Sequence, residues 1–350
     1  MNKDFNKNKI LIVGGAGFVG SNLTKYLLEE NNPRQIYIID NLISSEASNI
    51  PDDEKVIFIC GSIADDFILN KIPKDIEYVF HLSCYHGNQS SIFDPIADHD
   101  NNTITTLKLF NHLKDFKYLK RVIYAAAGCA VAEKTFTNAV ATKEDASLSL
   151  YHDSPYSISK LVGEMYGNYF FKQNNLPIIK ARFQNIYGPG EILGAGIWRG
   201  TINTIWRNVI PTFIWKSLAK ESLPLENGGI NSRDFIFVKD ICRGLVCCAF
   251  NGKPGESYNL ASGIEKTILE VANLINKYTG NETPCEIKPI RDWDKSGKRF
   301  GSTVKSREEI GFIAQQDFEE GLKLTIDWTK KNKEFIQRNI NKHNYKVGLE

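Results

Sequence analysis

One stretch near the N-terminus, where a short apolar run breaks into regularly spaced glycines, constrains the fold more than any other part of the chain. Residues 10–13 read Ile-Leu-Ile-Val, and Gly14, Gly17 and Gly20 follow before a leucine pattern of helical period. Glycines permit a tight turn and a close approach of the backbone to a pyrophosphate, while the next helix presents N–H groups and a positive dipole at its N-terminus. The stretch therefore predicts a buried strand, a phosphate-binding turn and a helix.

An acidic residue completes this pattern. Asp40 ends the next apolar run, residues 36–39, at the distance from the glycines that a dinucleotide-binding unit requires. A carboxylate there accepts a hydrogen bond from the ribose 2′-hydroxyl, which favours NAD over NADP. We therefore predict NAD as the cofactor.

Composition and charge exclude several classes of protein. The chain has 350 residues, of which 42% are hydrophobic and 24% charged, as is usual for a globular protein. A net charge of +2 gives no reason to expect a nucleic acid or a membrane surface as partner. Residues 1–9 carry no secretory signal, and the seven cysteines lack metal-site spacing. We expect a cytoplasmic protein with free thiols and no metal.

The order of apolar runs and helical patterns predicts an α/β fold, a Rossmann-type doubly wound parallel sheet with a smaller C-terminal α/β substrate domain. The expected strands are 10–14, 36–40, 56–60, 78–82, 121–126 and 178–183, and the expected helices are 18–30, 65–71, 98–116 and 155–174. Further strands and helices are expected at 233–239, 240–250, 257–260, 267–279 and 317–340, with a frayed tail. We assign residues 1–185 mainly to the cofactor domain and 186–340 mainly to the substrate domain, with residues of about 230–260 crossing back to the first sheet.

A tyrosine and a lysine one helical turn apart form the candidate catalytic pair. Tyr156 and Lys160 stand at i and i+4 in the helix expected over 155–174, with Ser154 as its cap and Pro155 in its first turn. A nearby ammonium favours the phenolate, which makes the tyrosine a usable base near neutral pH. The pair alone is more often a solvated helix face, but behind a dinucleotide fingerprint it predicts an oxidoreductase.

Four ordered motifs, at residues 14–20, 156–160, 182–189 and 233–238, resemble those of the extended short-chain dehydrogenases/reductases, and more narrowly the nucleotide-sugar epimerase/dehydratase group. The resemblance implies a Rossmann NAD domain and a second domain that binds a nucleoside-diphosphate sugar, with GDP or UDP as the nucleotide. It also implies that Tyr156 removes a proton from a sugar hydroxyl, usually at C4, while a hydride passes to NAD. A homodimer or higher homo-oligomer through the helices at 98–116 and 155–174 is implied as well.

The same resemblance assigns binding residues position by position. Asn185 and Arg233 match the family's contacts to the diphosphate, and Arg291 with Asp294 matches its R-x-x-D motif, which meets phosphate and ribose. His86 and Arg199 are further predicted substrate contacts. The predicted cofactor contacts are Gly14, Gly17, Phe18, Val19, Asp40, Asn41, Ser62, Ile63, Leu82, Ser83, Cys84, Tyr156 and Lys160.

The chain departs from the family at one catalytic position. Where the family has Ser or Thr after its fifth strand, this chain has Ala127, which neither donates nor accepts a hydrogen bond. The 4,6-dehydratases follow that residue with Asp-Glu, whereas Gly128 and Cys129 follow here, so we expect no dehydration. What compensates for the missing hydroxyl is not evident from the sequence.

These residues leave several activities open. The leading reading is oxidation at C4 by a tightly held NAD, either as a net 4-dehydrogenase that gives a 4-keto sugar or as a 4-epimerase. The chain resembles the GDP-mannose 3,5-epimerases in carrying a cysteine at position 129, which allows a 3,5-epimerase and favours GDP, although such a cysteine is more often a small buried hydrophobe. A nucleotide-binding scaffold that has lost catalysis is the alternative from another class; Ala127 favours it, and Tyr156 and Lys160 oppose it.

Overall fold

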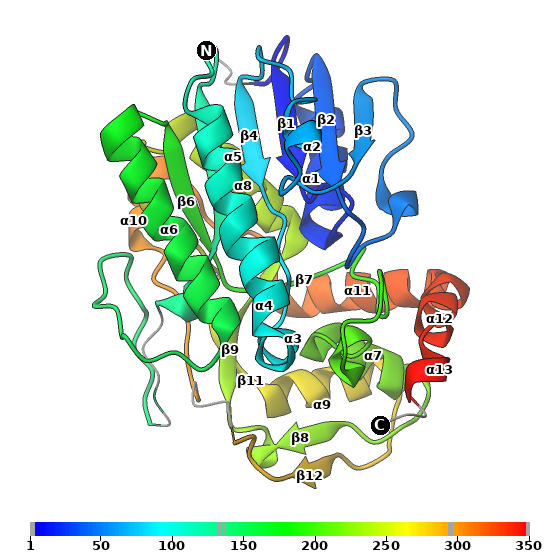
Figure 1. Cartoon of the computed structure of the whole chain (residues 1–350). Helices are drawn as coiled ribbons and strands as arrows, with labels where there is room; N and C mark the ends of the chain where they lie inside the picture. Colours follow the sequence, from blue (N-terminus) through cyan, green and yellow to red (C-terminus); the bar gives the residue numbers. More distant parts are fainter. Residues whose placement is uncertain (1–3, 132–134, 136, 293–296, 348–350) are drawn as a thin grey trace.

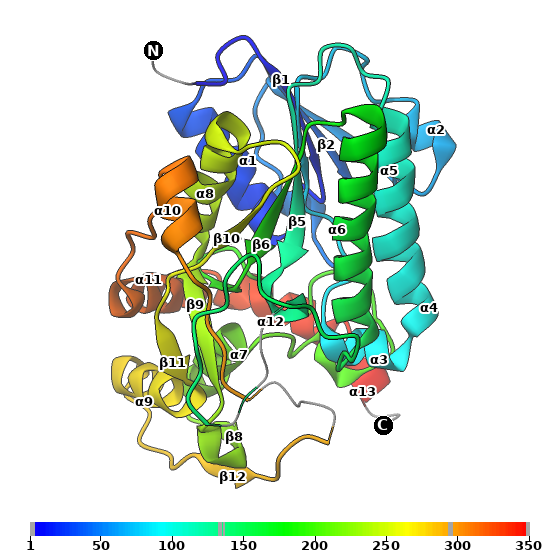
Figure 2. The same cartoon turned by 90° about the vertical axis from the view of Figure 1, so that its left-hand side faces the viewer.

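A sheet of seven parallel strands forms the centre of the computed structural model, which describes residues 4–131, 135, 137–292 and 297–347. The strand order is β10-β6-β5-β4-β1-β2-β3, and every neighbouring pair is parallel (Figure 1; β5 and β10 are labelled in Figure 2). The strands are β1 (Lys9–Val13), β2 (Gln35–Asp40), β3 (Val56–Cys60), β4 (Tyr78–His81), β5 (Arg121–Ala127), β6 (Ile178–Phe183) and β10 (Ser257–Leu260). This order is that of a doubly wound dinucleotide fold with one added strand, which confirms the predicted fold class.

Side chains of the sheet alternate between two apolar layers. Ile10 and Ile12 of β1 belong to one core cluster, and Leu11 and Val13 belong to the other. Figure 2 shows the sheet between two layers of helices that bury these faces. The helices on the first face are α1 (Phe18–Glu30), α8 (Val238–Asn251) and α10 (Val304–Ile310), and those on the second are α2 (Asp66–Leu69), α5 (Thr105–Leu113) and α6 (Pro155–Asn174). Near-continuous apolar strands are what a sheet covered on both faces requires.

The second part of the molecule lies beyond the carboxyl ends of the strands. It contains a three-stranded sheet, a two-stranded sheet and further helices around a core of their own (Figure 1). These elements are β7 (Asn185–Tyr187), β9 (Ser232–Phe237), β11 (Glu265–Thr267), β8 (Pro224–Glu226), β12 (Glu286–Lys288), α7 (Val209–Leu218), α9 (Ile268–Thr279) and α11 (Phe318–Lys331). The chain returns to the large sheet at β10, which pairs with β6.

Two predicted helices are not continuous. The one expected over 98–116 consists of the end of α4 (Pro95–Asp98), a π-helical turn (His99–Ile104) and α5. The one expected over 317–340 breaks at Asn332, between α11 and α12 (Lys333–Asn341). The tail is not frayed directly after α12, because α13 (Asn344–Val347) follows and His343 before it is buried. No helix of the described chain is long and apolar enough to cross a membrane.

Candidate functional site

A single cavity of about 660 Å³ runs between the carboxyl ends of the large sheet and the second part of the molecule. All thirteen predicted cofactor contacts line it. Ligands of open α/β folds bind at this edge of the sheet, where successive strands end in loops. The structure thus brings together residues that the sequence spreads from Gly14 to Lys160.

The glycine turn at one end of the cavity fits a dinucleotide. Gly14 has a φ of +85°, and a Cβ on it would lie 2.5 Å from the backbone nitrogen of Ser83, so a side chain here would collide with the next loop. Gly17 is the N-cap of α1, whose first N–H groups therefore face the cavity without a capping side chain. A tight cradle with free amides is the arrangement that holds a pyrophosphate. The residues present therefore fit NAD.

Asp40 organises the loop expected to hold the adenosine ribose. Its Oδ2 accepts a hydrogen bond from the Ala16 amide at 3.0 Å. Its Oδ1 accepts from the Leu42 amide at 2.8 Å and from the Ser45 hydroxyl at 2.9 Å. A carboxylate has further lone pairs for ribose hydroxyls. The residue thus fixes the shape of this part of the cavity in addition to its predicted contact.

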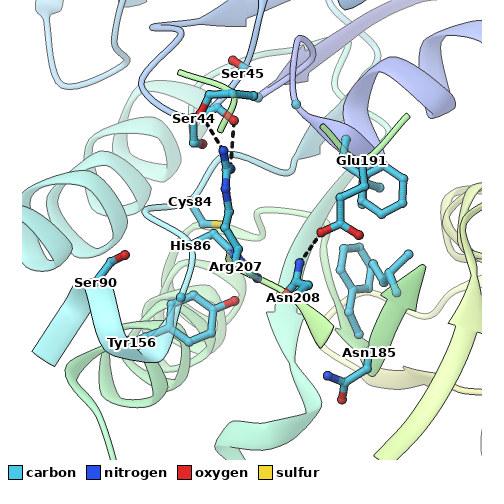
Figure 3. Close-up of a pocket in the computed structure, with 18 of the residues that line it drawn as sticks. Ser44, Ser45, Cys84, His86, Ser90, Tyr156, Asn185, Glu191, Arg207 and Asn208 are labelled. Carbon is cyan, nitrogen blue, oxygen red and sulfur yellow. Dashed lines mark hydrogen bonds between the residues drawn. The ribbon is translucent and has the colours of Figure 1, made fainter. Parts of the chain in front are cut away.

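The candidate catalytic pair is held by a well-capped helix. The Ser154 hydroxyl accepts from the Ser157 amide and Pro155 occupies the first turn of α6, which confirms the predicted cap. Tyr156 follows Pro155 in this first turn, Lys160 lies one turn further along, and both line the cavity (Figure 3 labels Tyr156). Lys160 is buried, with its ammonium 4.9 Å from the centre of the Tyr124 ring. A buried ammonium stabilises negative charge in its surroundings.

The π-helical turn supports this helix. The Asn102 side chain accepts from the Tyr85 amide at 2.7 Å and donates to Asp98 at 2.8 Å and to the Ser159 hydroxyl at 3.2 Å. It thereby ties the loop after β4 to α6 beside Lys160. Single π-helical turns occur most often at functional sites. This turn could not be predicted from the sequence, because its residues carry no distinctive pattern.

A neutral histidine lies beside the catalytic tyrosine. The ring centres of His86 and Tyr156 are 5.9 Å apart in an edge-to-face arrangement, and both residues line the cavity (Figure 3). Burial, together with the nearby charges of Arg199, Arg207 and Lys160, lowers the pKa of His86 to about 3. The imidazole therefore stays uncharged at neutral pH, with one nitrogen as donor and the other as acceptor.

Three predicted phosphate contacts line the other end of the cavity. They are Asn185 on β7, Arg233 on β9 and Arg291. Arg233 donates to the carbonyls of Ser232 and Gly297, and Arg291 pairs with Glu226. Side chains of Asn and Arg are well suited to phosphate oxygens.

Three predicted site residues are not found among the described residues that line the cavity. Arg199 is not among the residues that line the cavity; it is buried and donates to the His86 carbonyl at 2.8 Å. Its guanidinium carbon lies 5.5 Å from the centre of the Tyr85 ring, behind the cavity wall. Asp294 and the side chain of Cys129 lie outside the described part of the chain.

Sequence reasoning missed a second polar group on the cavity wall, formed by Glu191, Arg207 and Asn208 (Figure 3). The Asn208 amide donates to Glu191 Oε1, and burial raises the pKa of Glu191 to about 7. These residues lie in or next to a glycine-rich stretch without a clean period, so no pattern marked them. The described residues contain no cluster of side chains able to hold a metal.

Comparisons with known proteins agree with this geometry. Residues 10–261 match the model of the NAD dependent epimerase/dehydratase family. The Bordetella bronchiseptica enzyme WbmF, crystallised in complex with NAD+ and UDP, is 50% identical, covers 99% of each chain and superposes with a TM-score of 0.88.

Two curated relatives carry different activities. A putative UDP-glucose 4-epimerase of Methanocaldococcus jannaschii is 28% identical over 92% of this chain and 99% of its own length. A dTDP-glucose 4,6-dehydratase of Streptomyces antibioticus is 26% identical over 93% of each. Both activities are therefore represented among the relatives.

Proposed function

The chain belongs to the NAD-dependent epimerase/dehydratase family, and from that premise we propose that it is a UDP-sugar 4-epimerase that retains its NAD. One observation carries the proposal. The glycine turn, the Tyr156–Lys160 pair and the arginines Arg233 and Arg291 line the same continuous cavity. A cofactor at one end and a nucleotide sugar at the other would then meet at Tyr156.

The proposed chemistry assigns a role to each residue at that meeting point. When bound, NAD would take a hydride from C4 of the sugar and return it to the opposite face. Tyr156 would accept the proton of the C4 hydroxyl and give it back, while the Lys160 ammonium would stabilise the phenolate. Asn185, Arg233 and Arg291 would hold the diphosphate while the oxidised sugar turns.

His86 is the group that we propose in place of the missing Ser/Thr. Ala127 lines the cavity with a methyl group, whereas the uncharged imidazole beside Tyr156 can both donate and accept. None of the described residues forms a hydrogen bond with its ring nitrogens, so both are available to a sugar hydroxyl. A neutral hydrogen-bonding group beside the base is what the Ser/Thr provides elsewhere in the family.

UDP is the proposed nucleotide because WbmF was crystallised with UDP and the archaeal relative is named for UDP-glucose. The expected preference for GDP rested on Cys129, whose side chain is not described. A 4,6-dehydratase is also among the relatives. This chain's own residues nevertheless oppose dehydration, since Gly128 and Cys129 stand where an acid pair would be needed.

The test follows reduced nicotinamide by absorbance and sugar products by chromatography. Cofactor-stripped protein is incubated with NAD and a panel of UDP-, dTDP- and GDP-sugars, with Tyr156→Phe as the matched control. We expect a C4 isomer of one UDP-sugar without a lasting absorbance rise. A lasting rise would instead identify a net dehydrogenase, and a 4-keto-6-deoxy product would identify a dehydratase. Silence across the panel would support the non-catalytic scaffold.

A further inference from the structure

The segment of residues 190–207 crosses the cofactor end of the cavity from one side to the other. At its start, the Asn22 side chain of α1 donates to the Pro189 carbonyl at 3.1 Å, and a Cβ on Gly190 would lie 2.8 Å from the same side chain. Further on, the Ile197 amide donates to the Ile43 carbonyl at 3.1 Å, in the loop that follows Asp40. The segment thus spans from the phosphate-binding helix to the loop expected to hold the adenosine ribose.

Contacts from the C-terminal helices hold the segment against that loop. Glu46 accepts from the Gly196 amide at 2.9 Å and from the Lys342 ammonium that follows α12. His343 donates through Nε2 to the Gly194 carbonyl at 2.8 Å. Gly196 packs so closely that a Cβ would lie 2.3 Å from the Ile43 carbonyl oxygen, and its φ is +84°. These contacts therefore hold the segment in its position over the cofactor end of the cavity.

Arg207 ends the segment with its guanidinium on the cavity wall. It donates to the carbonyls of Thr204 at 3.2 Å, Ser44 at 3.1 Å and Ala195 at 2.5 Å. Figure 3 shows the side chain extending toward Ser44 and Ser45, within the loop organised by Asp40. A guanidinium has five N–H groups, so these three bonds fix its plane and leave donors for a ligand.

The charge of Arg207 has no carboxylate partner among the described residues. Glu191 is bonded to Asn208, and Glu46 is bonded to Lys342 and the Gly196 amide. Burial lowers the pKa of Arg207 to about 9, with Arg199 acting in the same direction and Glu191 against it. Arg207 is half-buried, and a cation partly removed from water without a carboxylate partner favours a bound anion.

We infer that Arg207 binds the diphosphate of the dinucleotide and that the 190–207 segment closes over the cofactor from the substrate side. This rests on the proposed use of NAD. A diphosphate is the anion that fits, because the segment crosses between the N-terminus of α1 and the ribose loop. A planar guanidinium also suits two phosphate oxygens. Cofactor contacts would then come from a stretch outside the glycine fingerprint.

Binding measurements on cofactor-free protein test this without any turnover. NAD and ADP-ribose carry the diphosphate, and adenosine lacks it; all three are titrated against wild type and Arg207→Gln. We expect the variant to bind NAD and ADP-ribose about 10- to 100-fold more weakly, the range for lost charge-assisted hydrogen bonds, and adenosine within about twofold of wild type. Arg307→Gln removes the same charge from an exposed site on α10 and serves as the matched control.

Two further variants keep the inference testable should Arg207→Gln fold poorly. Arg207→Lys keeps the charge but loses the planar, forked arrangement of N–H donors. It should weaken the binding of ADP-ribose about tenfold while leaving the binding of adenosine unchanged. Gly196→Ala moves the segment from the ribose loop without a change of charge, and should speed NAD release measured by rapid dilution. Unchanged ADP-ribose binding in both arginine variants, or equal weakening of adenosine, would overturn the inference. Absence of NAD binding by the wild type would instead refute the proposed function itself.

Discussion

The cofactor end and the substrate end of the cavity are built in different ways. The cofactor end uses the loops that directly follow β1, β2 and β4, and its glycines act through backbone geometry. The substrate end gathers side chains from β7, β9 and the loop after β12, which lie far apart along the chain. The backbone requirements of the cofactor end lie within one strand–turn–helix pattern, whereas the substrate end is indicated only by separate family motifs in distant segments.

Tyr156→Phe tests the point where the two ends meet, and it should have the largest effect. Loss of a general base costs between about 10² and 10⁴-fold in kcat. Both ends of the cavity are left intact, so the affinities for NAD and UDP should stay within about twofold. Steady-state rates and calorimetric titrations measure the two quantities. A variant with near wild-type turnover would remove Tyr156 from the mechanism.

Gly14→Ala tests the cofactor end by itself. The added Cβ would meet the Ser83 backbone, and the φ of +85° strains any residue but glycine. Strain of this kind costs on the order of 1–3 kcal/mol, which corresponds to roughly a 10- to 100-fold loss of NAD affinity. UDP affinity should change little, because the diphosphate contacts are remote from the turn. Equal weakening of both ligands would show that the two ends are not independent.

His86→Ala tests whether the imidazole replaces the missing Ser/Thr hydroxyl as the hydrogen-bonding group beside Tyr156. We expect kcat to fall about tenfold, in line with the loss of one hydrogen bond to the reacting group. The double variant His86→Ala/Ala127→Ser should regain most of that rate, because a hydroxyl returns at the family position. If His86→Ala lost activity only to the extent that it lost thermal stability, and the added Ala127→Ser did not restore activity, His86 would have a structural role only.

Glu191→Gln should have the smallest effect on activity and ligand affinity. Its expected effect is on stability and should appear only at higher pH. The folded-state pKa of Glu191 is raised to about 7 by burial, from 4.5. The folded protein therefore binds more protons between these values, so this carboxyl reduces stability as the pH rises through that range, and the whole cost is present above pH 7.

The amide cannot ionise, so Glu191→Gln should be more stable than wild type by up to about 3 kcal/mol at pH 8.5 and should differ little at pH 4.5. Urea unfolding of the cofactor-free protein at both values measures the difference. If the free energies of unfolding of wild type and variant changed equally between the two pH values, Glu191 would ionise normally in the folded protein.

The local patterns determined most of the large sheet, the cofactor cradle and the catalytic pair. The glycine run, Asp40 and the capped helix of Tyr156 depend on contacts within one strand–turn–helix unit, so their physics is contained in neighbouring residues. The same is true of the missing hydroxyl at Ala127, which the sequence alone identifies.

Only the tertiary structure decided where the remaining groups lie. It placed Arg199 behind the wall and Arg207 on it, although both come from one stretch without a regular pattern. It also brought His86 to Tyr156 and the C-terminal Lys342 to Glu46 across the whole length of the chain. The physical reason is that burial and ion pairing between distant segments depend on packing, which local sequence periodicity does not encode.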